Sequence, residues 1–106
     1  MNKKRKIVFG FKGKKYSISE YKICSSFFSK MRGLMFRKKS FKTPLLFTFN
    51  SLGRYAIHSF FCRKFLAVWI LEENGKMQII DVKTVLPWKS SVVPIKKFNL
   101  LLEIPL

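Results

Sequence analysis

The stretch that decides the fold is FLAVWILEENGKMQIIDVKTV, residues 65–85, in which two apolar runs flank a turn. Asn74-Gly75 is the strongest hairpin signal in the chain, because these residue types accept the positive φ angles of a two-residue turn. The first run, 65–71, has no uncharged polar or charged residue, so we expect a strand covered on both faces, with Trp69 in the core. The stretch therefore predicts an antiparallel hairpin near the centre of a sheet.

Alternating apolar and polar residues extend this β pattern in both directions from the hairpin. The further strands expected are residues 6–11, 16–24, 44–49, 54–61 and 98–104. We expect turns at 12–15 and 50–53, and a loop held by two prolines at 86–94. The basic turn at 12–15 makes the first two of these strands a hairpin.

One segment follows a helical period instead. Its apolar stripe consists of Phe27, Phe28, Met31, Leu34 and Met35. Ser25 or Ser26 is suited to cap the N-terminus of this helix. Gly33 lies on its less apolar side, either because the helix ends there in a left-handed cap or because another group approaches the backbone closely.

These elements predict one mostly β (α+β) domain over residues 1–106. The expected architecture is a small curved antiparallel sheet or partly closed barrel of about seven strands, with the early helix over one opening or face. Residues 1–5 are expected to form a flexible basic tail. No apolar run approaches the roughly 20 residues of a membrane span, and the start lacks the apolar core of a signal peptide. We therefore expect a cytosolic monomer.

The two cysteines, Cys24 and Cys62, stand far apart with no CxxC motif and no companion histidines. This spacing excludes the common zinc patterns, and in a reducing compartment we expect two free thiols. The segment FGFKGKK lacks the spacing of a phosphate-binding glycine loop. We expect no metal and no cofactor.

The charge is strongly basic and unevenly placed. The net charge is +17, from 22 Lys or Arg and 5 Asp or Glu. Residues 1–42 hold fourteen of the basic residues against one acid, Glu20, and so contribute +13. Such asymmetry favours a polyanion partner such as RNA or the ribosome. Codon bias toward lysine is the alternative, although it does not account for the scarcity of acids.

The residues expected to contact a nucleic acid are the early cations. They are Lys3, Lys4, Arg5, Lys12, Lys14, Lys15, Arg37, Lys38 and Lys39. With so few carboxylates in the chain, most of these cations have no internal partner, which favours an external anion for Arg37, Lys38 and Lys39.

Four phrases in order resemble one known family. They are RGLMFR (32–37), IHSFFCR (57–63), LPW (86–88) and LLLEIP (100–105), with EENG between the second and the third. Together they are similar to the archaeal branch of the domain of unknown function 192, over roughly residues 17–105. The resemblance implies a compact β-rich fold with one early helix, and no enzyme activity.

The chain also departs from this family's pattern. Phe65 and Ala67 stand where the family usually has proline and aspartate. Relatives usually continue beyond the position of Leu106. A role that depended on that aspartate or that tail is in doubt for this chain.

A second set of candidates could form a ligand pocket: Arg32, His58, Arg63 and Trp88. Arginine suits a planar anion, but Arg32 and Arg63 could equally fix the helix on the sheet through internal hydrogen bonds. His58 is the only histidine and could be a hydrogen-bonded rim residue. Trp88 could stack on a base or cover one end of the barrel.

The residues give little support for catalysis. On a strand, His58 and Cys62 would be about 13 Å apart, too far for proton transfer. An enzyme would need His58 near Cys24 or Asp81. We therefore expect a non-catalytic module that binds a polyanion such as RNA through its basic N-terminal third. The alternative is a barrel that binds a small anion or peptide near Arg32, His58 and Arg63.

Overall fold

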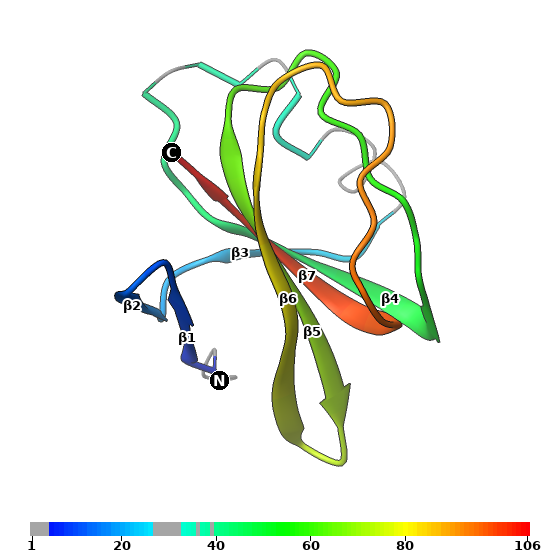
Figure 1. Cartoon of the computed structure of the whole chain (residues 1–106). Coiled ribbons are helices and arrows are strands. Elements are labelled where there is room, and N and C mark those ends of the chain that lie inside the picture. The colour runs from blue at the N-terminus through cyan, green and yellow to red at the C-terminus, as the bar shows by residue number, and fades with distance from the viewer. Residues whose placement is uncertain (1–4, 27–32, 36, 39) are drawn as a thin grey trace.

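The computed structural model describes residues 5–26, 33–35, 37–38 and 40–106 of the chain. These residues form seven strands and no helix (Figure 1). The strands are β1 (Ile7–Phe11), β2 (Lys14–Ile18), β3 (Lys22–Cys24), β4 (Leu45–Gly53), β5 (Phe65–Glu73), β6 (Lys76–Val85) and β7 (Phe98–Pro105). The expected β-rich character and number of strands are confirmed.

The strands make two sheets. β1 and β2 form a two-stranded sheet, and the others form a five-stranded sheet in the order β3-β4-β7-β5-β6. β3 and β4 are parallel, and every other pair is antiparallel. Because β3 and β6 remain as unpaired edges, the described strands do not close into a barrel. The partly closed barrel expected from the sequence is therefore wrong.

The hairpin of β5 and β6 forms as the sequence predicts. Asn74 and Gly75 have φ angles of 52° and 78°, and Glu73 pairs with Lys76 across the turn. The apolar run of β5 is buried on both faces, and Trp69 is fully buried. β5 lies between β6 and β7, while the central strand is β7. The C-terminal strand thus inserts between two segments that precede it in the chain.

Each face of the five-stranded sheet carries its own core, because alternate residues of β5 point to opposite sides. Phe65, Ala67 and Trp69 belong to one core, which the connections of the chain cover. Leu66 and Val68 belong to the other core, which the β1–β2 hairpin covers. The sheet is therefore the middle layer of the domain.

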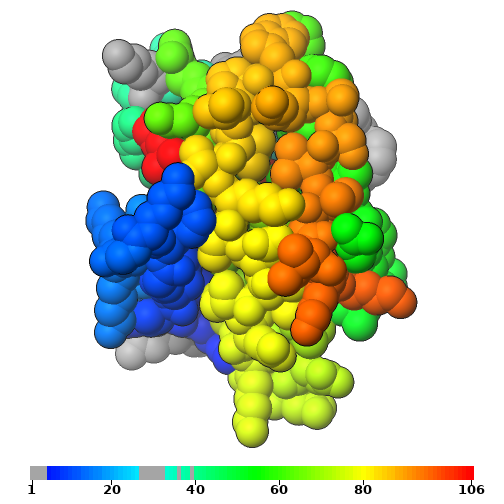
Figure 2. All heavy atoms as spheres, viewed as in Figure 1, coloured from blue at the N-terminus to red at the C-terminus, as the bar shows by residue number. Residues whose placement is uncertain are grey.

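The β1–β2 hairpin lies on one side of the sheet, and the connection 86–97 lies away from it. Ile7 and Phe9 are buried against the sheet, whereas Val8 is 43% exposed. Figure 2 shows the hairpin in blue, separated from the orange segment 86–97 by β6 in yellow. The basic turn at its tip has positive φ at Lys12 and Gly13, which completes the expected first hairpin.

The strand expected over residues 16–24 is divided between the two sheets. β2 ends at Ile18, and β3 begins at Lys22 in the other sheet. The buried positions shift from even numbers to Tyr21, whose hydroxyl donates to the Arg5 carbonyl at 2.6 Å. One continuous strand cannot bury both sets of residues on one face, so the chain breaks between them.

Two further expectations are corrected. Residues 54–61 do not form a strand, and their only described β pairing is a bridge between Ile57 and Val92. The buried side chain of Ser59 instead binds backbone groups of another loop. The turn expected at 50–53 is the end of β4, where an irregularity between Thr48 and Gly53 shifts the register with β7.

The early helix lies mostly outside the described residues, since residues 27–32 and 36 are not among them. Residues 33–35, at its expected end, form a turn. Gly33 has a φ of 46°, which is the left-handed conformation of a glycine that caps a helix. Of the expected basic tail, only Arg5 is described, and its guanidinium donates to the Gly75 carbonyl at 2.5 Å.

Candidate functional site

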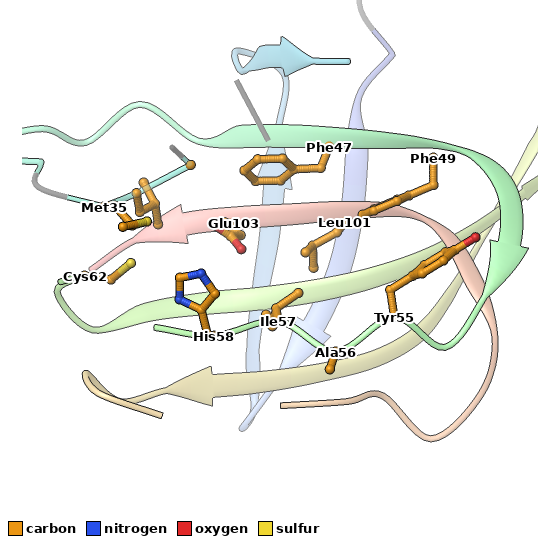
Figure 3. Close-up of a pocket in the computed structure, with 12 residues that line it drawn as sticks. Met35, Phe47, Phe49, Tyr55, Ala56, Ile57, His58, Cys62, Leu101 and Glu103 are labelled. Carbon is orange, nitrogen blue, oxygen red and sulfur yellow. The ribbon is translucent and has the colours of Figure 1, made fainter. Parts of the chain in front are cut away.

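A pocket of about 180 Å³ opens on the face of the sheet opposite the β1–β2 hairpin. Its floor comes from β4 and β7, with Phe47 and Phe49 on the first strand and Leu101 and Glu103 on the second. Figure 3 shows the segment that carries Tyr55, Ile57 and His58 along the other side of this pocket. Gly33, Leu34, Met35, Ala56 and Cys62 complete the lining.

The wall of the pocket is held by the backbone bonds of one loop to another. Ile57 and Val92 exchange two hydrogen bonds of 2.9 and 2.8 Å. The Ser59 hydroxyl donates to the Leu86 carbonyl at 2.6 Å and accepts the Lys89 N–H at 2.8 Å. Ser59 is fully buried, so these bonds satisfy a group that water cannot reach.

A tight turn brings His58 and Cys62 to the same pocket. Phe61 has a φ of 60°, and the Cys62 N–H donates to the Ser59 carbonyl at 3.2 Å. Both His58 and Cys62 line the pocket. The separation of about 13 Å expected from strand geometry does not apply, because this segment is not a strand.

Glu103 is the acidic group of this pocket. Its side chain is buried, with only 7% of the residue exposed, and it reaches toward the space between Phe47 and His58 in Figure 3. Burial raises the pKa of the Glu103 carboxyl from 4.5 to about 8, because the charged form loses its hydration. Near neutral pH this carboxyl is therefore mostly protonated.

The position where the family resemblance implies an aspartate lies beside Glu103. Ala67 of β5 and Leu45 of β4 are the register partners of Glu103 on β7. Directly paired residues of neighbouring strands point to the same face, so an aspartate at position 67 would stand next to this carboxyl. In this chain, Glu103 is the one carboxylate at that place among the described residues.

Cys62 is not an activated thiol. Burial, and secondarily the negative charge of Glu103, raise the pKa of the Cys62 thiol to about 11. Its Sγ donates to the Phe60 carbonyl at 3.5 Å. Because the thiolate is the nucleophilic form, Cys62 is poorly suited to attack a substrate near neutral pH.

His58 stands at the exposed side of the pocket. Its Nδ1 accepts the Phe60 N–H at 3.2 Å, so in the neutral ring the proton is on Nε2. The ring also stacks on Phe60, with 5.2 Å between the centroids. His58 can therefore offer one N–H group to a bound molecule.

The structure does not gather the predicted ligand residues into one site. Arg32 lies outside the described residues. Arg63 lines a separate small hollow with Arg37, Lys38 and Lys64. Trp88 lines neither hollow; it is 61% exposed and contacts the edge of Phe61 at a centroid distance of 4.9 Å. Of the four predicted residues, only His58 lines the pocket.

The predicted nucleic-acid residues fall into three groups. Lys3, Lys4 and Lys39 lie outside the described residues. Arg5, Lys12, Lys14, Lys15 and Lys38 are exposed. Arg37 is half-buried; its Nε donates to the Gly33 carbonyl at 3.1 Å, and its guanidinium lies 4.4 Å from the Phe41 ring centroid. Arg37 thus has an internal role in the loop.

The partners that an enzyme would need for His58 lie elsewhere. Cys24 is buried in the core and does not line the pocket. Asp81 accepts the N–H groups of Val82 and Ile95 and lies 3.8 Å from the Lys83 ammonium. Neither residue faces His58 in the pocket.

Sequence reasoning missed Glu103 and the aromatic residues Phe49 and Tyr55. A signal for Glu103 was present, because this acid interrupts the apolar run FNLLLEI (98–104) at a position that a central strand buries. Tyr55 stacks on Phe49 with 5.0 Å between ring centroids, a contact that no sequence period predicts.

The chain has distant similarity to an archaeal protein and to solved structures without an established function. No model of a known protein family matches it. UPF0127 protein PH1112 of Pyrococcus horikoshii is 30% identical over 70 residues, which are 66% of this chain and 59% of that protein.

Two crystal structures share the fold. A protein of unknown function from Novosphingobium aromaticivorans matches with a TM-score of 0.68 and 15% identity, over 92% of this chain and 69% of that one. A protein from Sinorhizobium meliloti described as a candidate transcription regulator matches with a TM-score of 0.70 and 14% identity, over 92% and 76% of the two chains. At these identities the likeness concerns the fold alone.

Proposed function

We propose that this protein is a non-catalytic module that binds a polyanion such as RNA through its basic N-terminal third. The β1–β2 hairpin is the proposed centre of that surface. On this proposal the protein acts in the cytosol, and it is a divergent member of the family with the domain of unknown function 192. The ordered phrases and the similarity to the archaeal relative support that membership.

The observation that carries the proposal is the lack of internal partners for the cations. Of the 22 Lys and Arg residues, only Lys3, Lys4, Lys30, Arg32 and Lys39 fall outside the described part. The described residues form a single ion pair, between Lys83 and Asp81. No described cation among the first 42 residues is in an ion pair, so their charge is available to phosphates.

The hairpin presents cations and aromatic rings together. Lys12, Lys14 and Lys15 surround a shallow depression at its tip and are exposed. The Lys14 ammonium lies 5.0 Å from the centroid of Tyr16, and the Lys12 ammonium lies 5.4 Å from that of Phe11. Lysines next to aromatic rings are typical of surfaces that follow a nucleic-acid backbone.

A salt-dependent titration tests the proposal. Fluorescence anisotropy of labelled short RNA and DNA is measured at several salt concentrations. If six phosphates are neutralised, log K falls with log salt with a slope of about −4 on a single strand and about −5 on a duplex. Absence of binding at low salt, or binding without a salt dependence, contradicts the proposal.

A matched pair of variants separates the hairpin from net charge. Replacing Lys12, Lys14 and Lys15 by Gln removes three charges from the hairpin. Replacing Lys89, Lys96 and Lys97 by Gln removes three charges from exposed positions on the connection 86–97. The first variant is expected to reduce the slope by two to three, since each lost phosphate contact contributes about 0.7 to 0.9. Equal losses in both variants would show that only net charge matters.

A further inference from the structure

Glu103 is a buried acid that lacks a partner. Among the described residues it makes no hydrogen bond and no ion pair, although it is 93% buried and its neighbours Leu101 and Leu102 are fully enclosed. A buried polar group without a partner is costly, and a charged one is more so. Such a group facing a cavity is one that a bound molecule could satisfy.

The rest of the pocket suits an apolar body and a positive charge. Phe47, Phe49 and Tyr55 contribute aromatic rings to the lining, and Leu101 and Ile57 contribute aliphatic surface. Aromatic faces attract organic cations. No Lys or Arg occurs among the described residues that line it. This is notable in a chain with 22 such residues.

We propose that this pocket binds a small organic cation, with its amidinium or ammonium group on Glu103 and its apolar body between Phe47, Phe49 and Tyr55. The volume of about 180 Å³ is below the roughly 300 Å³ at which drug-sized sites begin, so the ligand is small. His58 lies at the exposed side and offers its Nε2–H to a polar end of the ligand. This site is separate from the basic surface of the hairpin.

The net charge of +17 does not exclude this ligand. Exposed charges farther away than about 8 Å are largely screened at physiological ionic strength, whereas a contact with a buried carboxylate is screened much less. The acid inside the pocket therefore decides the sign of the ligand. The long-range field of the lysines lowers the rate at which a cation arrives, and it leaves the contact itself in place.

Binding of a cation is coupled to ionisation of Glu103. The empty pocket favours the protonated acid, with a pKa of about 8, whereas the cation requires the carboxylate. Of the other titratable groups that face it, Cys62 stays protonated through pH 9, since its pKa is about 11; His58 and Tyr55 are tested by substitution. The ionised fraction of Glu103 rises about tenfold from pH 7 to pH 9, so affinity rises by the same factor.

Benzamidine and benzamide are the probes, because they have nearly the same shape and only the first carries a charge. Calorimetry of the full chain at about pH 7 and pH 9 is expected to show benzamidine binding about tenfold more tightly at the higher pH. Benzamide is expected to bind more weakly and without that increase. Equal binding of the two compounds, or no binding of benzamidine at pH 9, overturns the proposal.

Substitutions assign the effect to the pocket. Glu103→Gln is expected to lower benzamidine affinity at pH 9 at least tenfold and to abolish its rise with pH. Glu73→Gln removes an exposed acid near the hairpin turn and is expected to change neither. His58→Gln and Tyr55→Phe are expected to keep the rise with pH. If Glu103→Gln does not fold, the pH dependence in the unmodified chain and the comparison with benzamide still decide the question.

Discussion

Stability should decrease as the pH rises, because Glu103 is forced to ionise inside the protein. Its pKa is 4.5 in the unfolded chain and about 8 in the folded chain. The folded state therefore binds more protons than the unfolded state between these values, and the free energy of unfolding falls with pH across that window. The favourable contribution is complete below pH 4.5 and is lost as pH rises through 8.

The magnitude follows from the difference between the two pKa values. At 1.36 kcal/mol per pH unit, the loss approaches about 5 kcal/mol, which is a large part of the 5–15 kcal/mol stability of a typical domain. Glu103→Gln keeps a neutral group of similar size and removes the ionisation. The variant should therefore match the unmodified chain near pH 5 and exceed its stability by several kcal/mol above pH 8.

Urea unfolding at about pH 5, 7 and 9, with a reductant for the free thiols, measures this difference. Repulsion among the lysines changes with pH in both proteins and cancels in the comparison. Glu73→Gln is the control, because that acid is exposed. Parallel pH profiles for the unmodified chain and Glu103→Gln would refute the reasoning, since they would mean that the buried carboxyl ionises at the same pH in both states.

Three further results are expected. Gly75→Ala should cost about 1–2 kcal/mol in urea unfolding, because alanine resists the φ of 78°, whereas Gly10→Ala has room and ordinary φ and should cost less than 1 kcal/mol. Ser59→Ala should cost about 1–3 kcal/mol by the same measurement, because the hydroxyl that donates to Leu86 is buried; an unchanged midpoint would contradict this. Alkylation of Cys62 should be slow at pH 7 and accelerate about tenfold per pH unit toward 11, and a rate that levels off near pH 8 would show a normal thiol.

The hairpin of β5 and β6 was predictable because its signals are local. Asn74-Gly75 sets the turn, and the apolar run that contains Trp69 requires cover on both faces. The same approach failed over residues 54–61, where alternation resembled a strand. There the decisive contact is between Ser59 and a loop about thirty residues later, and no local pattern encodes it.

The pocket was only partly predictable for the same reason. His58 was identified because it is the only histidine, but its relation to Cys62 depended on the backbone turn at Phe61. Glu103 was passed over because its chemistry comes from burial between β4 and β5, which follows from the position of β7 in the sheet.

The sequence by itself determined the β class, the central hairpin, the burial of Trp69 and the excess of positive charge, because residue type and spacing of near neighbours specify these properties. Tertiary structure decided that the C-terminal strand inserts at the middle of the sheet and that Glu103, His58 and the aromatic rings meet in one pocket. Contacts between segments far apart in the chain depend on how whole layers pack, and the ionisation of a carboxyl depends on the solvent that this packing excludes.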